Sequence, residues 1–214
     1  MSHHKPNITG LIITLNEEDN IRSVIEDLHF VDELIVLDSF STDRTVEIIK
    51  SYDHVKLYQN KFKNFTNQRN LALTYAQHDW VLFIDADERI PEKLEAEILK
   101  EVQKQNTADA YYFRRKFKFK NENLNFSGWQ TDKNVRLFKK SKAFYTKERL
   151  VHEILFVDGQ KKTLKNKLIH YSYIDYDSYK AKMISYAHLK ALELHLKGVK
   201  PNSFHFIIKP AYRF

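Results

Sequence analysis

Three carboxylates close the most apolar stretch of this sequence. Asp85, Asp87 and Glu88 follow the run 80–84, and Ala86 separates the first two acids. An unbroken apolar run predicts a strand buried on both faces, and α/β folds bind ligands at the carboxyl ends of such strands. Carboxylates this close repel each other unless a cation or hydrogen-bond donors lie between them. The segment therefore predicts half of a site for Mg²⁺ or Mn²⁺. The alternative is a polar turn in which Asp87 or Glu88 caps the next helix.

Further groups of polar residues could complete such a site. Residues 14–17 follow one apolar segment, Asp38 and Ser39 follow another, and Arg69 lies in a predicted helix. Because the ends of parallel strands meet at one edge of a sheet, these groups would lie near the acids. A carboxylate can accept hydrogen bonds from a base or ribose, and an arginine can face a base or a phosphate. The structural alternatives are a helix cap at Asn16 and a surface ion pair for Arg69.

The elements that carry these residues alternate between strand and helix. Four apolar strands are predicted, at 8–15, 33–38, 55–58 and 80–84. Three helices lie between them: one capped by Asn16 with acids in its first turn, one beginning at Ser41, and one over 65–76. Repeated strand–helix units with continuous apolar strands predict an α/β fold, in which helices flank a mostly parallel sheet.

The pattern changes after a predicted helix over 91–105. Residues 110–119 alternate aromatic and basic side chains with the period of a strand. Shorter strands are predicted at 135–138, 154–157 and 167–171, and a long helix over 177–197 ends at Gly198. We therefore predict one domain in two halves, with a mixed, partly antiparallel sheet and a long helix in the second. The halves are residues 1–105 and 106–214.

Composition narrows the class of protein. The chain has 214 residues, of which 43% are hydrophobic, and this is enough for one domain with a sizeable core. No apolar run reaches the length of a membrane span, and the first residues lack a signal-type apolar stretch, so we expect a cytoplasmic location. The sequence contains no cysteine, so any metal must be bound by oxygen or imidazole.

Positive charge is concentrated in the middle of the chain. The formal net charge is +7, and basic residues crowd the segment 114–142 with few acids among them. Such a face can bind nucleic acid, an anionic membrane, or a phosphorylated small molecule or glycan. The alternative is a solvated lysine-rich surface.

Taken in order, the motifs resemble those of family 2 glycosyltransferases, which have the Rossmann-like GT-A fold. The resemblance rests on the segments 11–18, 38–43, 68–70 and 85–88. Two further segments, 136–138 and 151–153, make the chain most similar to the bacterial group that contains lipopolysaccharide-core glucosyltransferases.

The resemblance implies a role for each residue of the predicted site. Asp38 would read uracil or ribose, and Arg69 would lie beside the nucleotide. Asp85 would lie near ribose or sugar hydroxyls, and residues 1–105 would form the nucleotide-sugar half. The full set expected to contact the nucleotide-sugar is Thr14, Asn16, Glu17, Asp38, Ser39, Arg69, Asp85 and Ala86.

Transfer of a sugar also needs a base and a cation. Glu153 sits where related enzymes carry the base that takes the acceptor proton, although a strand-end ion pair with His152 is the alternative. Asp87 would bind Mg²⁺ or Mn²⁺, so Glu153 and Asp87 are the expected catalytic residues. His170 would be a second metal ligand or a packed histidine, and Trp129 a platform for the acceptor sugar or a core residue.

The resemblance implies an inverting, metal-dependent transferase that moves a hexose, expected to be glucose, from a UDP-sugar to a cell-envelope glycan such as lipopolysaccharide core. The acceptor would be a glycan or lipid-linked glycan bound by residues 106–214, with peripheral contact to the anionic inner face of the cytoplasmic membrane and no nucleic acid. Related chains continue beyond residue 210, so a membrane-contacting tail is expected after Phe214.

Three other classes of protein share some of these features. A dinucleotide-dependent oxidoreductase would need a glycine-rich turn after its first strand, and the sequence has none there. A metal-dependent phosphohydrolase could use Asp85 as nucleophile and Asp87 as acid, but this leaves Asp38 and Arg69 unexplained. An RNA-binding module would use the aromatic and basic residues of 111–120 and leave the acidic cluster without a role.

Overall fold

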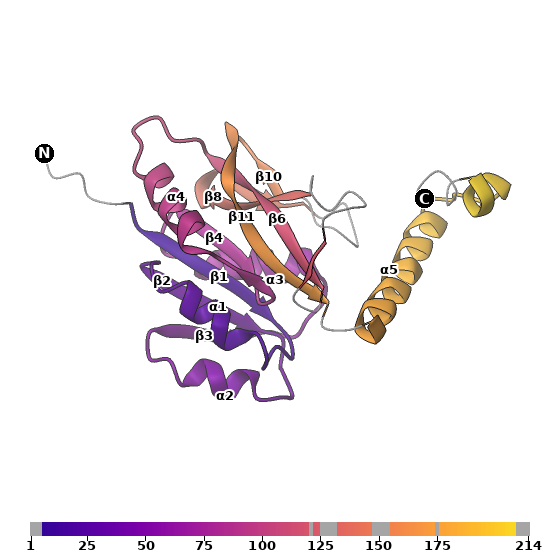
Figure 1. Ribbon diagram of the computed structural model, residues 1–214, viewed down its shortest axis with the longest axis horizontal. Coiled ribbons are helices and arrows are strands. Elements are labelled where there is room, and N and C mark those ends of the chain that lie inside the picture. The colour runs from indigo at the N-terminus through magenta and orange to yellow at the C-terminus, as the bar shows by residue number, and fades with distance from the viewer. Residues whose placement is uncertain (1–5, 120–121, 125–131, 147–154, 174–175, 209–214) are drawn as a thin grey trace, which may run out of the picture.

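The computed structural model describes residues 6–119, 122–124, 132–146, 155–173 and 176–208 (Figure 1). Within them, a nine-stranded sheet has the strand order β3-β2-β1-β4-β8-β6-β11-β5, and β7 pairs with β6. A second sheet contains only β9 and β10. The long sheet joins the two halves of the chain, because β4 pairs directly with β8.

The first half forms a parallel sheet, as the continuous apolar strands predicted. Its strands are β1 (Ile8–Thr14), β2 (Glu33–Asp38), β3 (Val55–Gln59) and β4 (Trp80–Asp85). β1 lies between β2 and β4 and is parallel to both. The three polar strand ends that the sequence placed near one edge, those of β1, β2 and β4, therefore point the same way.

The second half completes a mixed sheet. Its strands are β5 (Glu88–Arg89), β6 (Ala110–Phe119), β7 (Glu122–Asn123), β8 (Lys133–Lys139) and β11 (Lys161–Tyr173). β8 is antiparallel to both β4 and β6, whereas β11 is parallel to β6 and antiparallel to β5. The short sheet pairs β9 (Ala143–Tyr145), which follows the 3₁₀ turn η2 (Lys140–Lys142), with β10 (Leu155–Val157). The predicted α/β fold is confirmed.

Helices cover both faces of the sheet and bury two apolar cores. On one face, α1 (Ile21–Asp27), α2 (Thr45–Lys50) and α4 (Glu92–Val102) pack over alternate residues of β1, β4 and β6. On the other face, α3 (Phe65–Tyr75), β9 and β10 pack over the intervening residues. Because both faces are covered, the central strands are apolar throughout rather than alternating.

Two predicted helix starts are wrong. Asn16 does not cap α1, because its φ of 56° lies in the left-handed region and the helix begins at Ile21, after Asn20. Similarly, α2 begins at Thr45 rather than at Ser41. In both places the polar residues before the helix form loops that bind each other, which competes with helix formation.

The long helix α5 (Tyr176–Leu196) and the short η3 (Phe204–Ile208) follow β11 and lead away from the sheet (Figure 1). Large apolar side chains are exposed here, among them Leu196, Phe206 and Ile207, each about 70% accessible. Within the described residues, every helix is too short or too polar to cross a membrane.

Candidate functional site

The carboxyl ends of β1, β2 and β4 meet at one edge of the sheet. Thr14 pairs with Asp38 across β1 and β2. Ile13 pairs with Asp85 across β1 and β4, and Asp87 follows in the turn before β5. The polar groups that the sequence predicted to converge are therefore brought to the same edge.

Asp38 is buried and holds the loop that follows β2. Its Oδ1 accepts from the Ser41 hydroxyl, and its Oδ2 accepts from the Ser41 backbone N–H at 3.0 Å and from Gln59 Nε2 at 2.9 Å. The side chain has no exposed surface. Asp38 therefore shapes this loop, and its contact with a base or ribose stays a prediction.

The loops after β1 and β2 are joined by hydrogen bonds. Asn16 donates its backbone N–H to Ser41 Oγ at 2.8 Å, and its Oδ1 accepts from the Thr42 N–H at 2.8 Å. Asn16 and Phe40 both have positive φ, of 56° and 65°. This conformation is unfavourable for a phenylalanine and is found where surrounding contacts impose it, often at functional sites.

Thr14 presents a buried hydroxyl beside these loops. The residue is 5% exposed, and its Oγ1 has no hydrogen-bond partner within the described residues. Its carbonyl accepts from the Ser39 N–H at 2.8 Å, while the Glu17 N–H donates to Thr45 Oγ1 at 2.8 Å. A buried hydroxyl without a partner costs free energy, so a polar ligand atom at this place would be stabilising.

Two guanidinium groups hold Asp85. Arg69 Nη2 donates to Oδ1 at 2.7 Å, and Arg136 Nη2 donates to Oδ2. Burial alone would raise the pKa of Asp85, but Arg136 and Arg69 outweigh it and hold the pKa well below its usual range. Asp85 is therefore ionised, and its side chain is still 28% exposed toward the edge of the sheet.

Arg136 also binds Glu88, the third acid of the cluster. The Arg136 Nη2 lies 2.6 Å from Glu88 Oε1, while Glu88 Oε2 accepts from the Asp85 N–H at 3.0 Å. Glu88 has no exposed surface, and burial together with neighbouring Asp85 raises its pKa although Arg136 opposes this. Glu88 is thus a buried structural acid, and the prediction that it could cap the next helix is wrong.

Asp87 and His170 meet, although 82 residues separate them in the sequence. Asp87 Oδ2 and His170 Nε2 are 3.0 Å apart, and both side chains remain partly exposed, at 20% and 12%. The contact follows from the sheet, because His170 on β11 pairs with Glu88 on β5 and the Tyr171 N–H donates to the Asp87 carbonyl at 2.9 Å. The two predicted metal ligands are therefore adjacent.

The other side of the His170 ring is also fixed. Its Nδ1 lies 3.5 Å from Arg115 Nη1, and the ring is 5.1 Å from that of Phe117. Arg115 is itself held by Asp132, which accepts from Nε at 2.6 Å. The imidazole thus has a defined orientation before any ligand binds.

The Asp87–His170 pair has the chemistry of a partial site for Mg²⁺ or Mn²⁺. Their 3.0 Å separation is that of a hydrogen bond, and the same carboxylate oxygen and imidazole nitrogen would be able to hold a divalent ion. In the described part of the chain, no three histidine or acidic side chains are arranged so that they could hold one metal ion together. Two protein ligands would leave the remaining positions to water and phosphate oxygens, as such ions prefer at phosphate sites.

Three consecutive residues of α3 reach three different parts of the site. Gln68 donates to Ser39 Oγ at 3.1 Å in the loop after β2. Arg69 reaches Asp85 on β4. Asn70 exchanges two hydrogen bonds with the backbone of Tyr145 on β9, at 2.8 and 3.0 Å.

Sequence reasoning missed Arg136, Arg115 and the structural role of Glu88. A signal was present, since Arg136 lies between the apolar residues Val135 and Leu137, and a buried cation requires a paired acid. Two predicted residues, Glu153 and Trp129, lie outside the described residues. Ala86 is buried between the two acids, and its carbonyl accepts from Arg89 at 2.7 Å.

The fold is shared with solved structures. The structure of residues 1–349 of TarS from S. aureus in complex with UDP aligns with a TM-score of 0.56 at 16% identity, over 81% of this chain. This chain spans 62% of that one. The fold is therefore the GT-A fold of glycosyltransferases.

Sequence comparison gives the family. Residues 11–168 match the model of glycosyl transferase family 2. An uncharacterized glycosyltransferase of Rickettsia bellii is 31% identical over 207 residues, which are 92% of this chain and 70% of that protein. The lipopolysaccharide core biosynthesis glycosyltransferase LpsC of Rhizobium meliloti is 25% identical over 97% of this chain and 78% of its own length. The chain belongs to glycosyl transferase family 2 and is a glycosyltransferase.

Proposed function

We propose that this glycosyltransferase is inverting and metal-dependent and moves a hexose, with glucose the first choice, from a UDP-sugar to a cell-envelope glycan such as lipopolysaccharide core. The observation that carries the proposal is the Asp87–His170 pair, 3.0 Å apart at the same edge as Thr14 and Asp38. The name of LpsC supports the acceptor, and the UDP bound to TarS supports the donor.

Each residue of the site has a place in this reaction. Asp87 and His170 would hold Mg²⁺ or Mn²⁺, which when bound neutralises the charge that develops on the leaving diphosphate. Thr14 can donate its hydroxyl to the nucleotide, and Asn16, Glu17, Asp38 and Ser39 would contact the nucleotide-sugar beside it.

Asp85 is kept ionised by its two arginines and can accept from ribose or sugar hydroxyls through its exposed part. This arrangement does not favour the phosphohydrolase alternative, because both Asp85 oxygens are engaged by guanidinium groups that would weaken a nucleophile. Glu153 would take the proton from the acceptor hydroxyl as it attacks the anomeric carbon.

The proposed reaction also implies where in the cell the enzyme acts. A cytoplasmic enzyme in peripheral contact with the inner face of the membrane would meet both a soluble UDP-sugar and a lipid-linked glycan. The exposed Phe206 and Ile207 of η3, together with nearby basic residues, suit such a contact.

The proposal is tested by ligand-induced thermal stabilisation. The wild-type chain is heated with UDP, GDP or CMP, each with and without MnCl₂. A ligand at 100 times its dissociation constant stabilises by about 2.7 kcal/mol, which for a chain of this size raises the melting temperature by about 5–11 °C. We expect this shift with UDP and Mn²⁺ together, and loss of its Mn²⁺-dependent part in Asp87→Ala and His170→Ala.

The matched control is Asp53→Ala, since Asp53 is an exposed acid far from this edge in the loop before β3. The control should behave as the wild type. An unchanged shift in Asp87→Ala would refute the metal assignment. For the base, Glu153→Gln should slow UDP release from UDP-glucose in the presence of acceptor while UDP affinity is retained, and equal turnover would remove Glu153 from its role.

A further inference from the structure

Three cations stand side by side across three neighbouring strands. Lys167 on β11 pairs with Arg114 on β6, and Arg114 pairs with Lys133 on β8. Paired residues on adjacent strands point to the same face of a sheet, and the strands are about 4.8 Å apart. The backbones of these three residues therefore lie within about 10 Å of one another.

The row continues along β6 toward the site. Lys116 lies two residues beyond Arg114, on the same face, and pairs with Ile169. Ile169 in turn pairs with Arg89 on β5, directly beside the position where His170 meets Glu88. We call Lys133, Arg114, Lys167 and Lys116 the cation strip; it crosses β8, β6 and β11 on the face of the sheet opposite to the His170 side chain, which packs against Phe117.

The stability of the sheet does not account for this strip. Like charges placed directly opposite each other on neighbouring strands are destabilising. All four side chains are exposed, and none forms an ion pair with another residue that the structure describes. The nearest acid in the sequence, Asp132, is engaged by Arg115, which points to the opposite face.

The surroundings of the strip favour a sugar ligand with negative charge. Tyr112 lies on the same face, two residues before Arg114, and its ring centroid is 4.8 Å from Lys133 Nζ. An aromatic ring offers an apolar face to a sugar, and a guanidinium binds a phosphate through two parallel hydrogen bonds.

We propose that the cation strip binds phosphate groups of the acceptor, so that the substrate is a phosphorylated glycan. The inference rests on the proposed function and adds the chemical class of the acceptor. A glycan held by phosphates along β6 and β11 would extend to the edge of the sheet, where Asp87 and His170 lie.

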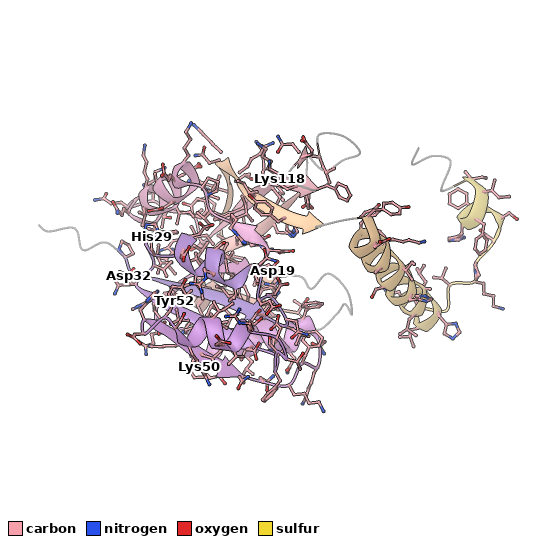
Figure 2. The ribbon with its side chains drawn as sticks, turned by 60° about the horizontal axis from the view of Figure 1, so that its bottom comes forward. Asp19, His29, Asp32, Lys50, Tyr52 and Lys118 are labelled. Atoms are coloured by element: carbon pink, nitrogen blue, oxygen red, sulfur yellow. The ribbon has the colours of Figure 1, made fainter. Side chains whose placement is uncertain are left out.

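The test measures binding of a labelled phosphorylated oligosaccharide, pentamannose 6-phosphate, at 50 and 200 mM NaCl. The same oligosaccharide after phosphatase treatment is the ligand control. The variant is Arg114→Gln/Lys167→Gln. The charge-matched control is Lys50→Gln/Lys100→Gln, because α2 and α4 cover the other face of the sheet. Figure 2 shows Lys50 and Lys118, the next residue of β6 on the strip's face, at opposite ends of the body.

We expect salt-sensitive binding of the phosphorylated glycan to the wild type and the control, and at least tenfold weaker binding to the variant. Equal binding to variant and wild type, or to the dephosphorylated glycan, would overturn the proposal. So would binding only to vesicles of 30% phosphatidylglycerol or to single-stranded RNA. If UDP and Mn²⁺ stabilise the wild type but the phosphorylated glycan does not bind, this inference alone is refuted. If the phosphorylated glycan binds but UDP and Mn²⁺ do not stabilise the wild type, the proposed function alone is refuted.

Discussion

Replacing Arg136 by methionine should cost the protein much of its stability, and the cost should depend on pH. Arg136 is 5% exposed and binds Asp85 and Glu88 with the same nitrogen. Methionine keeps most of the apolar volume but removes the charge. Asp85 then retains Arg69, whereas Glu88 retains the N–H of Asp85 and the more distant cation Arg115, whose Nη1 is 3.9 Å away.

The size of the stability loss in Arg136→Met follows from the Glu88 carboxylate, which loses its main charge partner. Removing one partner of a buried ion pair typically costs about 3–5 kcal/mol, and because Asp85 keeps a partner we expect about 3 kcal/mol at pH 8. For a chain of this size that lowers the melting temperature by about 6–12 °C. Arg136 is what opposes the raised pKa of Glu88, so its loss raises that pKa further.

The sign of the pH dependence can be worked out from Glu88. A carboxyl whose folded pKa lies above its usual 4.5 binds a proton in the folded state that the unfolded chain has released. The folded variant is therefore penalised increasingly as pH rises from about 4.5 through that raised pKa, by at most about 1.4 kcal/mol per pH unit. The loss relative to wild type should be smaller at pH 5 than at pH 8.

Urea denaturation followed by circular dichroism measures these differences. Glu88→Gln/Arg136→Met removes the unpaired charge as well and should be more stable than the single variant at pH 8. Arg44→Met is the control, because Arg44 and Glu47 form an exposed pair with about 70% of each side chain accessible, and it should cost less than about 1 kcal/mol. A single variant within 1 kcal/mol of wild type at pH 8, or a double variant that is no more stable, would refute the reasoning.

Three further predictions concern the supports of the site. Asn70→Ala should lower the free energy of unfolding by about 2 kcal/mol in urea, because it removes both hydrogen bonds between Asn70 and the backbone of Tyr145. A loss below about 0.5 kcal/mol would contradict this. Gly159→Ala should lower the melting temperature, because Gly159 has a φ of 148° and an added Cβ would lie 2.7 Å from Asp109 Cγ. An unchanged melting temperature would contradict this prediction. Thr14→Val should leave the free energy of unfolding unchanged or raise it by up to about 1 kcal/mol, because the Thr14 hydroxyl has no hydrogen-bond partner within the described residues. The same change should weaken UDP binding, measured by calorimetry. An unchanged affinity for UDP would exclude the Thr14 hydroxyl from the nucleotide site.

Much of the fold could be predicted because its signals are local. The continuous apolar runs correspond to the parallel strands, and the alternating residues 110–119 coincide with β6. β11 begins at Lys161, well before the predicted 167, because its lysine-rich first part lacks an apolar pattern and is held instead by pairing with β6. Pairing of this kind depends on distant residues and leaves no local signal.

In the site, too, the residues with a local sequence signal could be predicted and their distant partners could not. The positions of Asp85 and Asp87 after a buried strand were sufficient to predict a polar edge. Their partners were harder to find, since Arg136 lies 51 residues beyond Asp85 and His170 lies 83 beyond Asp87. A sequence motif shows which residues end a strand, but the strand order decides which side chains face them.

The three contacts of α3 have a consequence for how the chain can vary. Successive residues on a helix point about 100° apart, which is why Gln68, Arg69 and Asn70 reach the loop after β2, strand β4 and strand β9 at once. Insertion of one residue into α3 before Gln68 would turn all three away from their partners together. The exposed side of this helix can accept many substitutions. Its length up to Asn70 cannot change by even one residue without separating the carboxyl ends of β2 and β4 from β9.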